Sequence, residues 1–320
     1  MSIWKRAGVL ATAVGAIGIV DAAASDYPTR QIEIIVPFGA GGGGDTSQRI
    51  FNKHAEPVVG QTLLVTNKPG AGGVIGWAEA LQAAPDGYTL TAVTSPQNVL
   101  PAILSPAETG YTNDQFTYLC VFAVLADVIL VPEASEFQTL ADLVEHAKAN
   151  PGTVTVANTG TLGADYMVTV MIEDAAGIEM TKVPFNSGAE GNQATLSGTT
   201  NAQVASALHA VSQQGTMRTL GIASAERNPM IPDVPTFREQ GYDVISERYR
   251  VVAGPPGLPE DVVAYWADVC EQVTQDDAFI AEMAKVGAPV EYKGPEDTTK
   301  AIGDMVGAME RLAEQYDLRQ

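Results

Sequence analysis

A predicted strand that runs directly into a glycine-rich loop is the feature that most constrains this chain. The apolar run 31–38, QIEIIVPF, is followed over 39–46 by GAGGGGDT. Glycines leave the backbone N–H groups of a loop unshielded, and the amphipathic stretch 47–58 turns a helix N-terminus toward the same place. The pattern therefore predicts a cradle for an anion.

The same loop matches the dinucleotide-binding pattern G-x-G-x-x-G at Gly39, Gly41 and Gly44. A dinucleotide site needs an acidic residue about 20 positions further on, at the end of the second strand, to hold the ribose. Here the second predicted strand ends in the sequence NKPG at 67–70. The sequence therefore favours a small carboxylate or a similar anion over a nucleotide.

The N-terminus has the pattern of a secretory signal. Lys5 and Arg6 precede an apolar run over 7–20, and the alanines at 22–24 offer a cleavage site. The run is shorter than the roughly 20 residues that a membrane-spanning helix needs. We expect a signal peptide over 1–24 and a mature periplasmic chain, which would meet no NAD or ATP.

The composition argues against nucleic acid and anionic lipid as partners. The chain has 18 basic and 38 acidic residues, which gives a formal net charge of −20 at pH 7. A surface of this sign repels polyanions. An anionic ligand must therefore be held against the overall field by local backbone dipoles, which the glycine loop is expected to supply.

Cysteine and histidine give no sign of a metal site or a cofactor. The chain contains no C-x-x-C motif, and His54, His146 and His209 stand far apart. Cys120 and Cys270 could pair in an oxidising compartment, but nothing in the sequence brings them together, and we expect two buried free thiols. No G-x-S-x-G elbow appears, and no catalytic residue is predicted.

Strand-like and helix-like segments alternate along the chain. We predict strands over 31–37, 62–66, 88–93, 118–131, 153–157, 180–184, 201–205, 217–223 and 248–254, and helices over 45–58, 74–83, 139–149, 163–176, 189–197, 207–214, 235–240, 260–274, 277–285 and 296–316. Such alternation gives parallel sheets covered by helices. Because the chain exceeds one ordinary domain, we expect two α/β domains with a ligand between them.

Several short motifs follow one another in a fixed order along the mature chain. They are YP (27–28), VPFGAGGGGD (36–45), NKPGAGG (67–73), APDGYTL (84–90), AKANPG (147–152), VPF (183–185), IASAER (222–227), IPDVPT (231–236) and PPGLPE (255–260). In this order they resemble the solute-binding proteins of tripartite tricarboxylate transporters, the TctC or Bug family.

The resemblance implies a periplasmic binding protein-like α/β fold, with two Rossmann-like domains and a double-crossover hinge (type II). Domain 1 would comprise 25–125 plus 247–320, and domain 2 would comprise 126–246. The implied function is capture of a small carboxylate in the cleft and delivery to the permease subunits of the transporter, by a monomer that is not an enzyme. The alternative is a secreted α/β hydrolase or another enzyme acting on a small anion.

The resemblance, carried over position by position, implies four segments as the walls of the cleft, and each follows a predicted strand, where open α/β sheets bind ligands. One wall is 38–45 with 94–98, and the other is 158–163 with 185–189. The candidate ligand-binding residues are Phe38, Gly39, Ala40, Gly42, Gly43, Asp45, Thr94, Ser95, Asn98, Asn158, Thr159, Thr161, Asn186, Ser187 and Arg250. Each polar member could equally be an ordinary turn or helix cap.

Arginine is scarce, so Arg248 and Arg250 stand out in the segment where the chain should return between the domains. Arg250 could hold a second carboxylate of the ligand in a bidentate fork. A surface or interdomain salt bridge, with Glu247 or another acid, is the favoured alternative. The sequence ASA at 205–207 stands where many relatives carry a polar pair, so a plain or aromatic carboxylate is expected rather than an amino acid.

Overall fold

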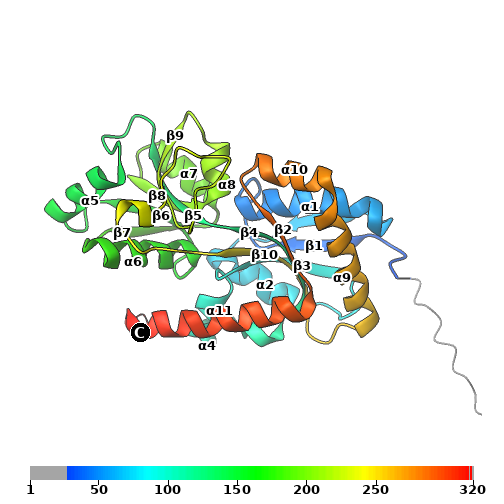
Figure 1. Cartoon of the computed structure of the whole chain (residues 1–320). Coiled ribbons are helices and arrows are strands. Elements are labelled where there is room, and N and C mark those ends of the chain that lie inside the picture. The colour runs from blue at the N-terminus through cyan, green and yellow to red at the C-terminus, as the bar shows by residue number, and fades with distance from the viewer. Residues whose placement is uncertain (1–26, 317, 319–320) are drawn as a thin grey trace, which may run out of the picture.

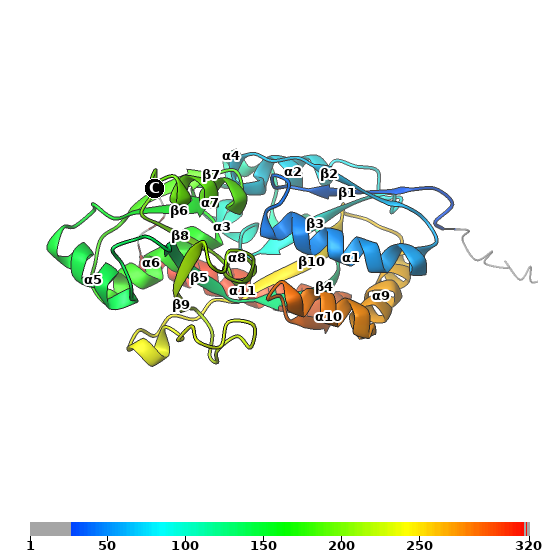
Figure 2. The same ribbon diagram turned by 90° about the horizontal axis from the view of Figure 1, so that it is seen from above.

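Two α/β lobes lie side by side in the computed structural model, which describes residues 27–316 and 318 (Figure 1). The predicted signal peptide lies outside these residues. No helix in the described part of the chain is both long and apolar enough to cross a bilayer. Viewed from above, the lobes form an elongated molecule (Figure 2).

The first lobe is built on a six-stranded mixed sheet of order β11-β4-β10-β3-β1-β2. β1 pairs in parallel with β2 and β3, whereas β10 is antiparallel to β3 and β4. The strands are β1 (Ile32–Val36), β2 (Leu63–Asn67), β3 (Thr89–Ser95), β4 (Thr117–Leu125), β10 (Arg248–Gly254) and β11 (Val290–Lys293).

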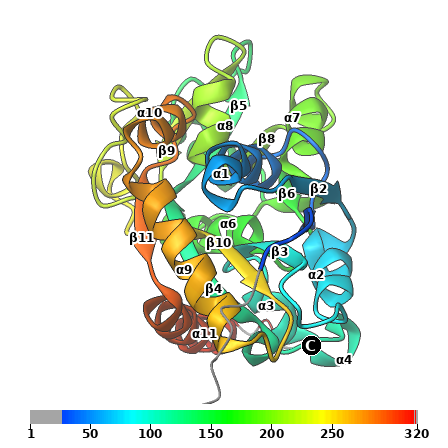
Figure 3. The same ribbon diagram turned by 90° about the vertical axis from the view of Figure 1, so that its right-hand side faces the viewer.

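Helices cover both faces of this sheet (Figure 3). One core joins the sheet to α1, α9 and α10 around Phe51, Phe122 and Phe279, and a second core on α2 and α11 includes Trp77 and Ile302. The helices are α1 (Gly43–Val59), α2 (Val74–Ala80), α3 (Val99–Leu104), α4 (Pro106–Thr109), α9 (Glu260–Gln275), α10 (Asp277–Lys285) and α11 (Pro295–Gln315), with short 3-10 turns at Ala71–Gly73 and Asn113–Gln115.

The second lobe is built on a five-stranded sheet of order β7-β6-β8-β5-β9. Its strands are β5 (Asp127–Pro132), β6 (Thr155–Thr159), β7 (Thr181–Phe185), β8 (Ala202–Ser206) and β9 (Met217–Ile222). Its helices are α5 (Leu140–Ala149), α6 (Ala164–Ala176), α7 (Gly188–Leu196) and α8 (Ala207–Ser212), followed by a 3-10 turn at Arg238–Gln240. The chain therefore repeats the strand–helix alternation that the sequence predicts.

Two segments cross between the lobes. The strand predicted over 118–131 is wrong as a single element, because β4 ends at Leu125 and β5 begins at Asp127, in a different sheet. Both halves are buried and apolar, so periodicity alone cannot separate them. The second crossing leads into β10, where Arg248 pairs with Leu125. All strands of the first sheet lie within proposed domain 1, and all strands of the second sheet lie within proposed domain 2. The exact domain boundaries stay a prediction.

Four further elements differ from the sequence prediction. β11 is a four-residue, half-exposed strand at the sheet edge, and too short to show a period. The helices α3 and α4 contain Pro101 and Pro106, which obscure a helical pattern. The helix predicted over 235–240 is only a 3-10 turn.

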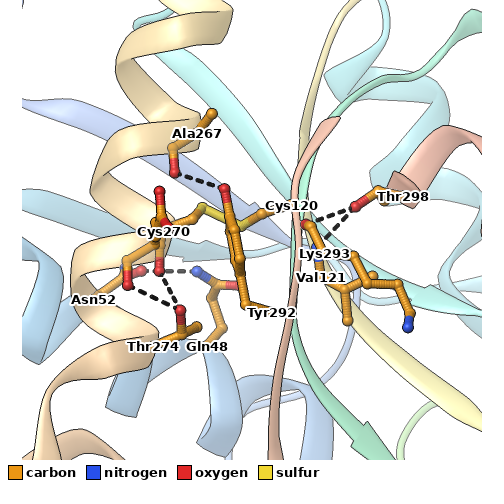
Figure 4. The surroundings of a disulfide bond; sticks show 11 residues. Gln48, Asn52, Cys120, Val121, Ala267, Cys270, Thr274, Tyr292, Lys293 and Thr298 are labelled. Carbon is orange, nitrogen blue, oxygen red and sulfur yellow. Dashed lines mark hydrogen bonds between the residues drawn. A yellow bond between two sulfur atoms is a disulfide. The ribbon is translucent and has the colours of Figure 1, made fainter. Parts of the chain in front are cut away.

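A disulfide joins Cys120 on β4 to Cys270 on α9, with Cα atoms 6.4 Å apart (Figure 4). The expectation of two free thiols is therefore wrong. α9 follows β10 in the chain and packs back on the first sheet, where both cysteines belong to the same core. Their approach depends on tertiary packing across a sequence separation of 150, which no local pattern reveals.

Opening this bridge should lower the free energy of unfolding by about 5 kcal/mol, because the chain-entropy model assigns a large effect to so long a closed loop. Urea unfolding with and without reductant measures the difference. The Cys120→Ala/Cys270→Ala variant is the control, since reductant should leave its unfolding midpoint unchanged. A wild-type midpoint that does not respond to reductant would contradict the prediction.

Candidate functional site

A small cavity of ≈ 30 Å³ lies between the lobes, beside the crossing strands. A water molecule needs roughly 10–15 Å³ measured in this way, so the cavity has room for about two waters. It is lined by Phe38, Gly42, Gly43, Gly44, Thr94 and Gln97 from the first lobe, by Thr159, Asp165, Gly188, Ala205, Ser206 and His209 from the second, and by Arg248 and Arg250 on β10.

The glycine loop brings the N-terminus of α1 to this cavity. Gly42 is the N-cap and Gly43 the first helical residue, so the helix begins two residues before the predicted start. A Cβ atom on Gly43 would lie 2.9 Å from the Ser206 hydroxyl and 3.2 Å from Nη2 of Arg250. Glycine is therefore required here because the second lobe and β10 approach the backbone directly. Figure 2 shows this end of α1 facing α7 and α8.

A buried ion cluster lies against the cavity. Nη2 of Arg248 contacts the carboxylates of both Asp127 on β5 and Asp165 on α6. Asp127 also accepts a hydrogen bond from the hydroxyl of Ser246, and Asp165 accepts one of 2.8 Å from the backbone N–H of Thr159. Burial raises the pKa of Asp127 against the attraction of Arg248.

Arg250 is a buried cation without an acidic partner. It is 4% exposed, its Nη1 donates a 2.7 Å hydrogen bond to the hydroxyl of Thr94, and its Nε has no partner. No carboxylate of the described residues lies within salt-bridge distance. Burial and the repulsion of Arg248 lower the pKa of Arg250 to about 9, so it is charged at neutral pH. The salt bridge favoured for Arg250 is formed by Arg248 instead, while Glu247 accepts a hydrogen bond from Tyr249.

Ser206 and His209 add neutral polar groups to the cavity wall. The Ser206 hydroxyl lies 3.4 Å from Nδ1 of His209, and Nε2 of the ring has no hydrogen-bond partner among the described residues. Burial lowers the pKa of His209 to about 4, so the imidazole is neutral at pH 7. Within residues 27–316 and 318, no three His, Cys, Asp or Glu side chains are grouped as metal ligands.

Gln97 connects the two lobes. Its Nε2 donates to the carbonyl oxygen of Thr159 at 2.7 Å, and its Oε1 accepts from the backbone N–H of Ala164 at 2.8 Å. A first-lobe side chain therefore caps α6 of the second lobe. A Cβ atom on Gly163 would stand 2.0 Å from Nε2 of Gln97, so only glycine leaves space for this contact.

Six of the fifteen candidate residues from the sequence line the cavity. They are Phe38, Gly42, Gly43, Thr94, Thr159 and Arg250. Gly39 and Ser187 face each other between the lobes, since a Cβ atom on Gly39 would lie 3.2 Å from the Ser187 hydroxyl. Any contact of these residues with a ligand stays a prediction.

The remaining candidates lie away from the cavity. Asp45 binds the side chains of Arg49 and Asn67, and the hydroxyl of Ser95 bonds the amide oxygen of Asn98 at 2.6 Å. The exposed positions are Ala40, Thr161 and Asn186, and the buried Asn158 donates to Thr169. In the structure these residues lie in turns or make internal hydrogen bonds, which is the alternative to ligand binding that the sequence left open.

Sequence reasoning missed several residues of the cavity wall. Gln97 and Gly188 stand inside the predicted wall segments but were not singled out. Ser206 follows a predicted strand, so the rule that located the other segments could have found it and the nearby His209. Asp165 gives no local signal, because only the tertiary structure brings it to Arg248.

The two arginines should differ sharply in their effect on stability. Arg248→Met is expected to lower the free energy of unfolding by about 3–5 kcal/mol, because it leaves two buried carboxylates without their cation. Arg250→Met should leave it unchanged or raise it, because the removed charge has no acidic partner. Urea unfolding at pH 7 measures both, with Arg227→Met as an exposed control for which only a small change is expected. Equal losses at 248 and 250 would contradict these roles.

Comparison with known proteins identifies the family. The family model described as tripartite tricarboxylate transporter family receptor, TctC, matches residues 48–318. Protein BugT of Bordetella pertussis is 25% identical over 311 residues, which cover 96% of this chain and 95% of BugT. Two solved structures, a periplasmic transporter and the periplasmic binding protein BugD, superpose with TM-scores of 0.88 and 0.87 at 27% and 25% identity, each covering 92% of this chain and 99% of the other.

These similarities confirm the predicted fold class, a periplasmic binding protein-like α/β fold with two Rossmann-like lobes and a type II double crossover. The family match extends over most of the chain, including both lobes. The resemblance read from the sequence motifs is therefore confirmed: the chain belongs to the TctC or Bug family, the solute-binding receptors of tripartite tricarboxylate transporters.

Proposed function

We propose that the solute is a small carboxylate, captured between the lobes in the periplasm and delivered to the permease subunits of a tripartite tricarboxylate transporter. We further propose a monomer that works without a cofactor and without catalysis, with domains 25–125 plus 247–320 and 126–246. The family assignment supports the transport role, and the cavity supports the chemistry.

The observation that carries the proposal is the unpaired charge of Arg250. A buried cation without a counter-ion is costly, and a ligand carboxylate would remove this cost through charge-assisted hydrogen bonds. The N-terminus of α1 reaches the same cavity at Gly43, and its free N–H groups favour an anion. The overall negative charge of the chain is thus opposed locally at this position.

Capture requires the lobes to separate. A cavity of ≈ 30 Å³ has no open space for an organic acid, so the lobes must separate to admit a ligand and then close around it with a larger cavity between them. Closure would form the Gln97 contacts with the second lobe and the approach of Gly72 to Gly160, where a Cβ atom on Gly160 would lie 2.7 Å from Cα of Gly72. The two crossing segments are the natural hinge.

The hydrolase alternative has one observation in its favour, the neighbouring Ser206 and His209. A general base works best with a pKa near the working pH, whereas burial lowers the pKa of His209 to about 4. Nε2 of the ring also has no partner among the described residues to orient it. We therefore propose binding without turnover.

Mature protein should be stabilised by a fitting carboxylate, by about 2.7 kcal/mol at 100 times the dissociation constant. Thermal shift against mono-, di- and tricarboxylic acids would find the ligand, and mass spectrometry should recover it unchanged. Arg250→Met should lose the shift, because the carboxylate loses its cation, whereas Arg227→Met should keep it. A shift that survives Arg250→Met would move the site, and an acid converted to product would favour the hydrolase.

Gln97→Ala and Gly163→Ala should each weaken ligand binding by about 1–3 kcal/mol, the scale of lost buried hydrogen bonds. The first removes the bridging side chain, and the second occupies its position. Because both changes remove the same contact, the double variant should cost no more than either single variant. Isothermal titration measures all three, with Gly303→Ala as the control, since a Cβ atom there meets nothing within 4 Å. Additive losses would show that the contact is not shared.

A further inference from the structure

The charged groups around the cavity are two guanidinium groups, two carboxylates and one imidazole. Both carboxylates, Asp127 and Asp165, contact Arg248, and neither contacts Arg250. His209 is neutral at pH 7 because burial lowers its pKa. With Asp127 and Asp165 ionised against Arg248, the formal charges of these five groups sum to zero when the site is empty.

The positive charge of Arg248 is already offset by two carboxylates and is not available to bind a ligand. Arg248 is 5% exposed, and its guanidinium is shared by two buried carboxylates. A ligand carboxylate that approached Arg248 would also approach Asp165, which lines the same cavity. Like charges at such short range repel strongly in a buried site.

The other polar groups of the cavity wall are uncharged. Thr94, Gln97, Thr159 and Ser206 offer hydroxyl and amide groups, and His209 offers a neutral ring nitrogen. The N-terminus of α1 contributes about half a positive charge, which suits one carboxylate already bound to Arg250. Neutral hydrogen-bonding groups of this kind match a hydroxyl, carbonyl, amide or protonated acid.

We propose that the closed site accepts one negative charge: the ligand is a monoanion whose single carboxylate binds Arg250, and the rest of the ligand is uncharged. A diacid enters only after its second carboxyl group has taken up a proton. This inference rests on the proposed function and narrows it, because it separates monocarboxylates from the di- and tricarboxylates for which the family is named.

Matched pairs of ligands test the charge rule directly. Malonate, succinate, glutarate and adipate are each compared with their own monomethyl ester, which keeps the carbon skeleton and removes one charge. The first charge of a diacid raises the pKa of its second carboxyl group to about 5.5. Roughly one diacid molecule in thirty is therefore a monoanion at pH 7, and the diacid should bind roughly thirtyfold more weakly than its half-ester. Its affinity should rise about tenfold as the pH is lowered from 7 to 6 and then level off near pH 5, while that of the half-ester stays nearly flat.

Proton counting gives an independent readout. Isothermal titration in two buffers of different ionisation enthalpy should show uptake of about one proton with the diacid and none with the half-ester. Asp165→Asn should reverse the preference, since Arg248 then keeps only one carboxylate and the site gains one positive charge. The diacid should then bind without proton uptake. Asp174→Asn, an exposed position on the same helix, is the control.

The outcomes separate the inference from the proposed function. Diacids that bind wild-type protein as tightly as their half-esters, with flat pH profiles, would overturn the inference and leave carboxylate binding intact. If neither series nor the simple monocarboxylates from acetate to hexanoate bind, the proposed function fails and the inference falls with it. The wild-type titrations decide this even if Asp165→Asn does not fold.

Discussion

The shared guanidinium of Arg248 is the interaction on which the rest of the structure depends. It lies on β10 beside the point where β4 becomes β5, and it binds one carboxylate on β5 and another on α6. It thereby fixes the crossing strands relative to the second lobe. Because Asp127 and Asp165 both bind Arg248, no acidic side chain neutralises the charge of Arg250, which lines the cavity. Structural rigidity and ligand chemistry thus arise from two adjacent arginines with different surroundings.

The alternation of strands and helices, and the place of the cleft beyond the strand ends, could be predicted from the sequence. Single side chains could not, because Thr94 and Ser95 are neighbours on one strand and point to different environments, one toward Arg250 and one toward Asn98. The sequence likewise could not tell Arg248 and Arg250 apart, since both lie in the same short segment, and the salt bridge favoured for Arg250 is made by Arg248. Which acid faces which arginine is decided by tertiary packing across the lobes.

The glycine loop lies at the cavity between the lobes, and the sequence gives only part of the reason for its glycines. The sequence suggests backbone N–H groups open to an anion, and α1 does begin at the cavity. The structure adds a steric requirement, because side chains from the second lobe and β10 occupy the space a Cβ atom on Gly43 would need. The loop must therefore lack side chains both to present its N–H groups to an anion and to let the lobes meet. The second requirement cannot be predicted from the sequence.

The disulfide gives the chain an unusual covalent connectivity. Residues 120–270 form a closed ring that contains every strand of the second sheet. The ring also contains β10 and most of β4 and α9 from the first lobe, and the other elements of that lobe lie on the two tails outside it. A protease that cuts one exposed loop of the second lobe would therefore leave two polypeptides joined by sulfur. They would migrate as one species on a gel until a reductant is added. A cut within residues 27–119 would instead produce an N-terminal fragment with no covalent bond to the rest of the chain, so only packing would hold it in place.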